Sequence, residues 1–232
     1  MRESILEVLR PIDATGASLV DLVEVALEQA ILDERLPEGS PLAEADLAVA
    51  LGVSRSPVRD ALRRLAHKGL ADVRPRKGVT VATFSPAQIS DFFDLRESLE
   101  GLAARLAAER MSAEEVGRLR SHLHRTSEEL AAGRPHGYPS SDEDFHARIL
   151  QGARSQQLKR AMQTIQARVR LFRRRSGAMR RRAEQALAEH RAILAAIESR
   201  DAGAAEAGMR QHIRNARENL LGKSSADDVI GR

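Results

Sequence analysis

The sequence contains no cysteine and no tryptophan, a single tyrosine and only 3% aromatic residues. Without cysteine there are no disulfides and no thiolate zinc sites, so any bound metal must be held by histidine and carboxylate side chains. So few aromatic residues indicate an aliphatic core, which is typical of helical proteins. No apolar run reaches the length of a bilayer span, and the N-terminus does not resemble a secretory signal. We therefore expect a cytoplasmic protein with no membrane contact.

The 232 residues are enough for two modest domains or one large one, and with 42% apolar residues the chain can bury a core in either case. Its 37 lysine and arginine residues slightly exceed its 33 aspartate and glutamate residues, which gives a formal charge of +4. A basic surface attracts phosphate, but so small an excess does not identify a nucleic-acid-binding protein. The order of residues along the chain must therefore show whether the protein binds nucleic acid.

The first part of the chain has the pattern of a winged helix-turn-helix domain. Apolar residues recur with helical spacing before Pro37, and Ser56 and Pro57 suit the N-cap and the first position of a later helix. After that helix, the tripeptide Arg76-Lys77-Gly78 separates two β-prone segments, which indicates a hairpin. We predict a DNA-binding domain over residues 1–83. Its expected elements are helices over 19–36, 44–51 and 56–69 and strands over 70–75 and 79–83.

The remainder of the chain has the pattern of an all-helical domain. Two capping boxes, Ser85 with Gln88 and Ser112 with Glu115, mark the starts of two helices. The predicted fold class is therefore mainly α: a winged helix-turn-helix domain followed by an antiparallel helical bundle over residues 84–222, with a flexible tail over 223–232. The expected helices are 86–110, 113–132, 141–151, 156–174, 180–200 and 202–221.

The third predicted helix carries a basic polar face. Apolar residues can pack it against the second helix across a turn at Gly52, and this packing leaves Arg55, Arg59 and Arg63 outside the core. The N-terminal end of such a helix suits phosphates and base edges in the major groove, and Arg76 and Lys77 at the hairpin tip can reach the DNA backbone. Any single arginine could instead lie on a solvated helix face without contacting DNA. The whole arrangement indicates double-stranded DNA as a partner.

Residues 42–65 resemble the N-terminal signature of the GntR family of bacterial regulators, L-x-E-x-x-L-A-x-x-L-G-V-S-R-x-P-V-R-[ED]-A-L-R-x-L. The resemblance implies that Arg55 and Arg59 contact the operator, with Ser56 and the wing glycine Gly78 assisting. One departure is Ala43, which stands where the family often has a serine or threonine cap. A missing cap costs about 1 kcal/mol of local stability and does not bear on function.

Four polar residues fall on apolar helix faces in the second domain. Asp142 and His146 are four residues apart, and His190 and His212 each interrupt an apolar stripe. Three imidazoles and a carboxylate from three helices form a sensible site for a divalent ion. Hydrogen-bonded core histidines are the alternative, and spacing alone leaves both open. The other histidines are expected on less apolar faces or in loops: His67, His122, His124 and His136.

The segments around these residues resemble the D-x-x-F-H, E-H and M-x-x-H-[IL] signals of the FCD ligand-binding domain. The resemblance implies a metal ion on Asp142, His146, His190 and His212, with zinc favoured and nickel and manganese as alternatives. It also implies that Arg96, which lies on an apolar helix face, binds the carboxylate of a small effector. From the residues alone, an internal ion pair of Arg96 with Glu97, Glu100 or another acid stays open. One or two of the eight arginines between residues 168 and 182 are expected to line the cavity.

The leading hypothesis is a homodimeric regulator, most simply a repressor, in which two DNA-binding domains contact a pseudo-palindromic operator and a small organic acid changes their spacing. The rival is a metal-dependent enzyme with an accessory DNA-binding arm, because a metal with open coordination positions can activate water. No candidate general base stands out near the proposed ligands, which argues against the enzyme. An architectural DNA-binding protein, the third hypothesis, does not account for the inward aspartate and histidines.

Overall fold

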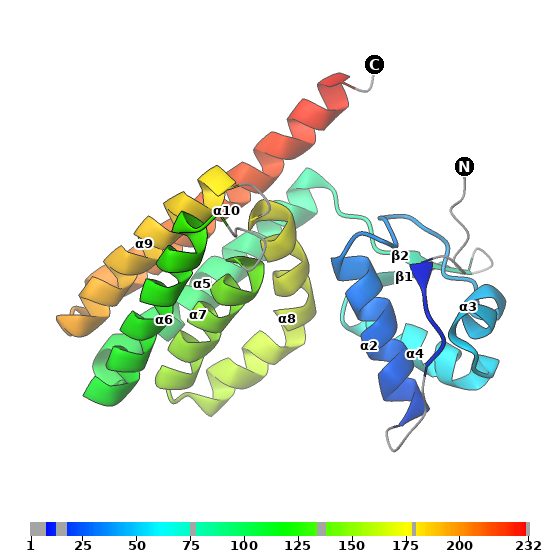
Figure 1. The fold of residues 1–232 in the computed structure, drawn as a ribbon, viewed down its shortest axis with the longest axis horizontal. Helices are drawn as coiled ribbons and strands as arrows, with labels where there is room; N and C mark the ends of the chain where they lie inside the picture. The colour runs from blue at the N-terminus through cyan, green and yellow to red at the C-terminus, as the bar shows by residue number, and fades with distance from the viewer. Residues whose placement is uncertain (1–7, 13–17, 75–77, 134–137, 178–179, 231–232) are drawn as a thin grey trace. The chain divides into compact units, whose positions relative to one another are not determined.

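The computed structural model describes residues 8–12, 18–74, 78–133, 138–177 and 180–230 (Figure 1). The chain divides into two compact units, the first reaching to Phe84 and the second comprising most residues from Ser85 onwards. This division falls beside the domain boundary expected from the sequence. Among the helices described, none is both long and apolar enough to cross a membrane.

The first unit is a winged helix-turn-helix domain. A buried aliphatic core, including Leu27, Leu47 and Leu62, joins its helices. Gly52 has a φ of 67° at the end of α3, and this left-handed conformation allows the tight turn into α4. The two strands are antiparallel, with Asp72 opposite Thr80. The elements are α2 (Leu19–Leu32), α3 (Glu44–Leu51), α4 (Arg55–His67), β1 (Ala71–Arg74) and β2 (Gly78–Val81).

Two helix ends in this unit differ from the sequence prediction. Helix α2 ends at Leu32 and not at residue 36, because the chain turns at Glu34, whose φ is 58°. Helix α4 starts after Ser54, so the predicted N-cap at Ser56 is wrong. Pro57 then occupies the third helical position, which is tolerated because the first-turn N–H groups have no partner within the helix.

The second unit is all-helical in the residues described. Both predicted capping boxes are present, with Ser85 and Ser112 each accepting a hydrogen bond from the backbone N–H three residues later. Helix α7 starts at Tyr138, earlier than predicted, since a proline at position 139 is also compatible with a first turn. The helices are α5 (Pro86–Arg110), α6 (Ala113–Ala131), α7 (Tyr138–Gly152), α8 (Gln156–Gly177), α9 (Arg180–Glu198) and α10 (Ala202–Ile230).

The C-terminal helix is longer than the sequence suggests. A flexible tail is predicted from Lys223, whereas α10 continues to Ile230. No glycine or proline interrupts residues 223–230, so nothing in the sequence stops the helix there.

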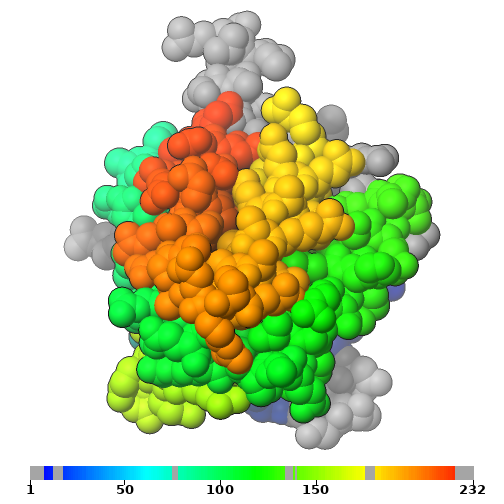
Figure 2. All heavy atoms as spheres, turned by 90° about the vertical axis from the view of Figure 1, so that its left-hand side faces the viewer, coloured from blue at the N-terminus to red at the C-terminus, as the bar shows by residue number. Residues whose placement is uncertain are grey.

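Helix α5 is the central element of the bundle, since it packs against α7, α9 and α10. On the face shown in Figure 2, α9 and α10 lie side by side and α6 flanks α9. A small aromatic cluster lies in the core, where the rings of Phe92, Phe93 and Phe172 have centroids 5.2 to 6.2 Å apart. This packing brings the inward faces of α5, α7, α9 and α10 together.

Candidate functional site

The candidate DNA-binding residues on α4 share one exposed face. Val58, Leu62 and other apolar residues of α4 are buried, whereas Arg55, Ser56, Arg59 and Arg63 are exposed. The segregation follows from the helical spacing, which places the arginines outside the apolar contacts of α4 with α2 and α3. A row of exposed guanidinium groups at a helix N-terminus suits the DNA backbone and base edges.

The wing is only partly described. Gly78 starts β2 with a φ of 85° and is exposed, so a side chain here would be strained. Arg76 and Lys77, the other predicted DNA contacts of the hairpin, lie outside the described residues.

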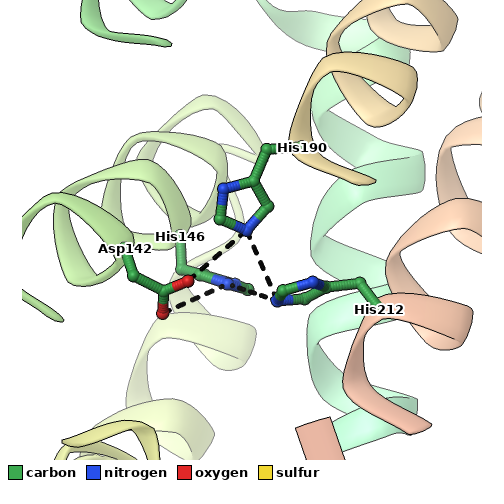
Figure 3. A group of neighbouring side chains, drawn as sticks. All are labelled: Asp142, His146, His190 and His212. Atoms are coloured by element: carbon green, nitrogen blue, oxygen red, sulfur yellow. Dashed lines mark hydrogen bonds and ion pairs between the residues drawn. The ribbon is translucent and has the colours of Figure 1, made fainter. Parts of the chain in front are cut away.

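The four predicted metal ligands come together inside the second unit (Figure 3). Asp142 and His146 lie one turn apart on α7, His190 lies on α9, and His212 lies on α10. All four are buried, with exposed fractions between 1% and 7%. One candidate ligand atom from each residue lies within 4.8 Å of the others. Helical phase therefore located an actual cluster.

The distances between these atoms suit a single cation. The His146 and His212 Nε2 atoms are 3.2 Å apart, and the His190 and His212 Nε2 atoms are 3.4 Å apart. Asp142 Oδ1 lies 3.5 Å from His190 Nε2. Nitrogen ligands each about 2.1 Å from one tetrahedral zinc ion would lie about 3.4 Å from each other.

Contacts with carboxylates indicate which ring nitrogens of His146 and His212 face the cluster. His212 Nδ1 lies 2.6 Å from a Glu189 carboxylate oxygen, and His146 Nδ1 pairs with Glu100. Because a carboxylate only accepts, each Nδ1 carries a proton and each ring turns its Nε2 toward the cluster. The His146 and His212 Nε2 atoms lie 3.2 Å apart, and a cation between them could accept a lone pair from each ring.

The protonation states also match the needs of a metal ion. Burial, with a contribution from Arg173, lowers the pKa of His146 to about 4, and burial lowers the pKa of His190 well below its usual value. Burial alone would raise the pKa of Asp142, but His146 and Arg173 together hold it below its usual value. At neutral pH, His146 and His190 thus offer neutral imidazoles beside the ionised Asp142 carboxylate.

Glu189 is itself held in place by two neighbours. Arg182 donates to both of its carboxylate oxygens at 3.0 Å, and Asn215 Nδ2 donates to Oε1 at 2.7 Å. Burial would raise the pKa of Glu189, but His212 and Arg182 lower it to about 2. The carboxylate stays ionised and orients His212, as outer carboxylates do for metal-bound histidines.

Glu100 forms the second outer contact. Arg96 Nε donates to its Oε1 at 2.5 Å, and Arg173 Nη2 donates to its Oε2 at 2.8 Å. Arg173 Nε also lies 3.3 Å from Asp142 Oδ2. The cluster of ligands therefore continues into a buried network of two arginines and one glutamate.

Arg96 is the candidate effector anchor, and its exposed fraction is only 1%. Of the internal acids that the sequence leaves open, Glu100 is its partner, whereas Glu97 pairs with Arg214 at 2.6 Å. Arg96 Nη1 has no hydrogen-bond partner among the described residues, although it is buried. A buried cationic donor without an acceptor can bind an anionic group.

Two family models match the chain and divide it as the structure does. Residues 19–81 match the model described as bacterial regulatory proteins, gntR family, and residues 91–215 match the FCD domain. The HTH-type transcriptional repressor RspR of Escherichia coli is 30% identical, with 78% of this chain and 80% of that protein covered. The chain belongs to the GntR family. It is a DNA-binding transcription regulator with an FCD domain.

Further relatives of this GntR-family regulator agree. The Uxu operon transcriptional regulator of E. coli is 31% identical, with 95% of this chain and 90% of that protein covered. Among solved structures, E. coli McbR/YncC shares the fold with a TM-score of 0.74 at 21% identity, over 90% of this chain and 99% of that one. The family and its relatives are regulators and not enzymes, which decides between the two hypotheses left by the sequence.

Sequence reasoning missed the two carboxylates that contact the candidate metal ligands. The sequence did not predict that Glu189 and Glu100 contact ligand histidines, although Glu189 directly precedes His190 and Glu100 lies one turn from Arg96. The expectation for His122 was wrong, because His122 is buried and its Nε2 donates to the Ser141 carbonyl at 2.9 Å. Its signal was weak, since the partner is a backbone atom on another helix.

Proposed function

We propose that this regulator binds one divalent metal ion through Asp142, His146, His190 and His212. The observation that carries the proposal is the convergence of three Nε2 atoms whose rings are held by carboxylates or packed in the core. Phe145 stacks on the His190 ring with centroids 3.9 Å apart, which restrains the third imidazole. Zinc suits this donor set best, and nickel and manganese are the alternatives.

The proposed effector is a small carboxylic acid. The bound ion would supply positive charge to which a carboxylate binds, and the unpaired Arg96 Nη1 is a second anchor for the same molecule. Glu100 orients Arg96 by holding its Nε. The protein would sense acids because an effector carboxylate could accept a hydrogen bond from the buried Arg96 Nη1, which has no partner among the described residues.

The proposed DNA contacts are divided between helix and wing. Arg55, Arg59 and Arg63 form the exposed basic face of α4, and Ser56 lies beside them. Gly78 allows the close approach of the wing backbone, while Arg76 and Lys77 are assigned from the sequence only. Repression is the favoured mode, since RspR and a probable D-xylose utilization operon repressor of Paenarthrobacter nicotinovorans, 29% identical, carry that name. As a DNA-binding regulator it would act in the bacterial cytoplasm.

A homodimer is the proposed active form, and α5 carries a self-complementary surface for it. Leu95 and Leu102 are exposed on α5, with exposed fractions of 46% and 39%, and Ser98 lies between them. If α5 crosses an antiparallel copy at Ser98, Asp91 of one chain meets Arg105 of the other. Apolar residues between matched charges are what a two-fold helix contact requires.

Replacing the exposed leucines of this α5 surface by charged residues should dissociate the dimer. We expect Leu95→Glu with Leu102→Glu to sediment as a monomer at concentrations where the wild-type chain sediments as a dimer. The matched control is Val49→Glu, because Val49 is also exposed but lies on α3. A double variant that remains dimeric would remove α5 from the interface.

Acid sensing is tested by operator affinity. The metal-loaded protein is bound to a duplex selected from a random library, and small mono-, di- and tricarboxylates are added at fixed ionic strength. At least one acid should change the operator affinity by a factor of about 5 to 150, the usual range of coupling between sites. If all acids leave the affinity unchanged at fixed salt, the proposed sensor function is wrong.

A further inference from the structure

Glu44 lies in the first turn of α3, where its carboxylate holds the guanidinium of Arg59. The Arg59 Nε atom lies 3.1 Å from both carboxylate oxygens, and Nη2 lies 2.9 Å from Oε2. This two-point pairing fixes the plane of the guanidinium as well as its position. The direction of Arg59 in the free protein is therefore set by a residue of a different helix.

This ion pair contributes little to the stability of the fold. The Arg59 and Glu44 side chains have exposed fractions of 54% and 33%, and ion pairs in water are weak. The carboxylate also lies among the basic residues of α4, since Arg59 first and then Arg55 and Arg63 lower the pKa of Glu44. A negative charge at this position opposes binding to any phosphate backbone. Neither the strength of this ion pair nor general DNA affinity explains why the carboxylate is directed at Arg59.

The atoms that Glu44 leaves free on Arg59 have a specific use. Glu44 occupies the Nε and one Nη2 proton, so the Nη1 protons and the other Nη2 proton still point outward. These form the two-pronged end of the guanidinium, which matches the O6 and N7 acceptors of guanine in the major groove. A phosphate contact needs no such fixed plane.

We propose that Glu44 is a specificity-determining residue, which orients Arg59 toward the guanine of one G·C pair in each operator half-site. The inference rests on the proposed assignment of Arg59 to DNA and adds the orienting role of Glu44. Glu44 trades general affinity for selectivity, because it repels phosphate everywhere but aligns Arg59 for one base edge.

The test compares Glu44→Gln with Asp60→Asn in the full-length protein. Asp60 lies on the same helix as Arg59 and pairs loosely with Arg63 at 3.6 Å, so its substitution removes the same charge without releasing Arg59. Affinities are measured at fixed salt for a duplex selected by the wild-type protein and for a scrambled duplex of the same composition. For Glu44→Gln we expect tighter binding to the scrambled duplex and about a tenfold loss in the ratio of selected to scrambled affinity.

The loss should be confined to one G·C pair per half-site, so a repeated selection with Glu44→Gln should relax only that position. Asp60→Asn should keep the wild-type ratio and the wild-type consensus. Arg59→Lys, which keeps the charge but not the two-pronged end, should lose the same selectivity as Glu44→Gln. Equal thermal melting of the variants and the wild type confirms that they are folded.

A Glu44→Gln protein with the wild-type ratio and consensus would overturn the orienting role. Arg59→Ala then separates the two ideas. If Arg59→Ala loses operator affinity while Glu44→Gln keeps its selectivity, only the role of Glu44 is wrong. If Arg59→Ala also binds the selected duplex like the wild type, the assignment of Arg59 to DNA is wrong as well.

Discussion

Replacing His212 by alanine is expected to abolish divalent metal binding by the full-length protein. His212 Nε2 lies close to two other candidate ligand atoms, 3.2 Å from His146 Nε2 and 3.4 Å from His190 Nε2. Its loss also leaves Glu189 without its imidazole partner. Because metal binds only the folded chain, the variant loses the linked stabilisation, about 4 kcal/mol at a thousandfold excess of metal over its dissociation constant.

The measurements are metal content by mass spectrometry and thermal unfolding with and without a chelator. The wild-type protein should hold one ion per chain and melt at a lower temperature after chelation. His212→Ala should hold no ion, and the chelator should not change its melting temperature. His124→Ala is the matched control, because the His124 side chain is 74% exposed and should not affect the metal. One ion per chain in His212→Ala, or a wild type that is insensitive to chelation, would contradict the metal site.

Replacing Glu100 by alanine should cause the largest loss of stability among the charged residues around the site. Its carboxylate contacts Arg96, Arg173 and His146 in a buried environment, so the substitution leaves the buried Arg96 guanidinium without its counter-charge and removes the Glu100 contact of Arg173. Breaking a buried ion pair from one side costs about 3 to 5 kcal/mol. Urea unfolding of Glu100→Ala should show a loss of this size.

Glu109→Ala provides the comparison on the same helix. Glu109 pairs with Arg105 at 3.4 Å, and both side chains are more than 40% exposed. Pairs of this kind contribute about 0 to 1 kcal/mol, so Glu109→Ala should unfold close to the wild type. Equal unfolding midpoints for Glu100→Ala and Glu109→Ala would show that the buried network does not stabilise the domain.

Local rules in the sequence predicted much of the fold. The two capping boxes located the starts of α5 and α6 because each uses residues within one helical turn. The start of α4 was misplaced because Pro57 is compatible with more than one position of the first turn. Serine and proline signals therefore indicate that a helix begins, but they leave its first residue open by a few positions.

The candidate metal ligands could be predicted from helical phase, since an inward histidine interrupts an apolar stripe. Their outer partners could not, because the contact of Glu100 on α5 with His146 on α7 depends on how two helices pack. The contact of Arg173 with Asp142 could not be predicted either, because the sequence does not distinguish Arg173 from the arginines beside it. Sequence periodicity gives the face of a helix, whereas tertiary packing decides which residue lies opposite.

We propose that binding of a metal ion and a small acid in the FCD domain controls DNA binding. Coupling of this kind is reciprocal, so an acid that weakens operator binding must itself bind more weakly to the operator complex. The most direct measurement is calorimetric titration of the metal-loaded protein with an active carboxylic acid, with and without saturating operator duplex at fixed salt. For a repressor released by its effector, we predict a dissociation constant for the acid that is higher with operator by the same factor that the acid weakens DNA binding. Equal dissociation constants with and without operator would contradict the account.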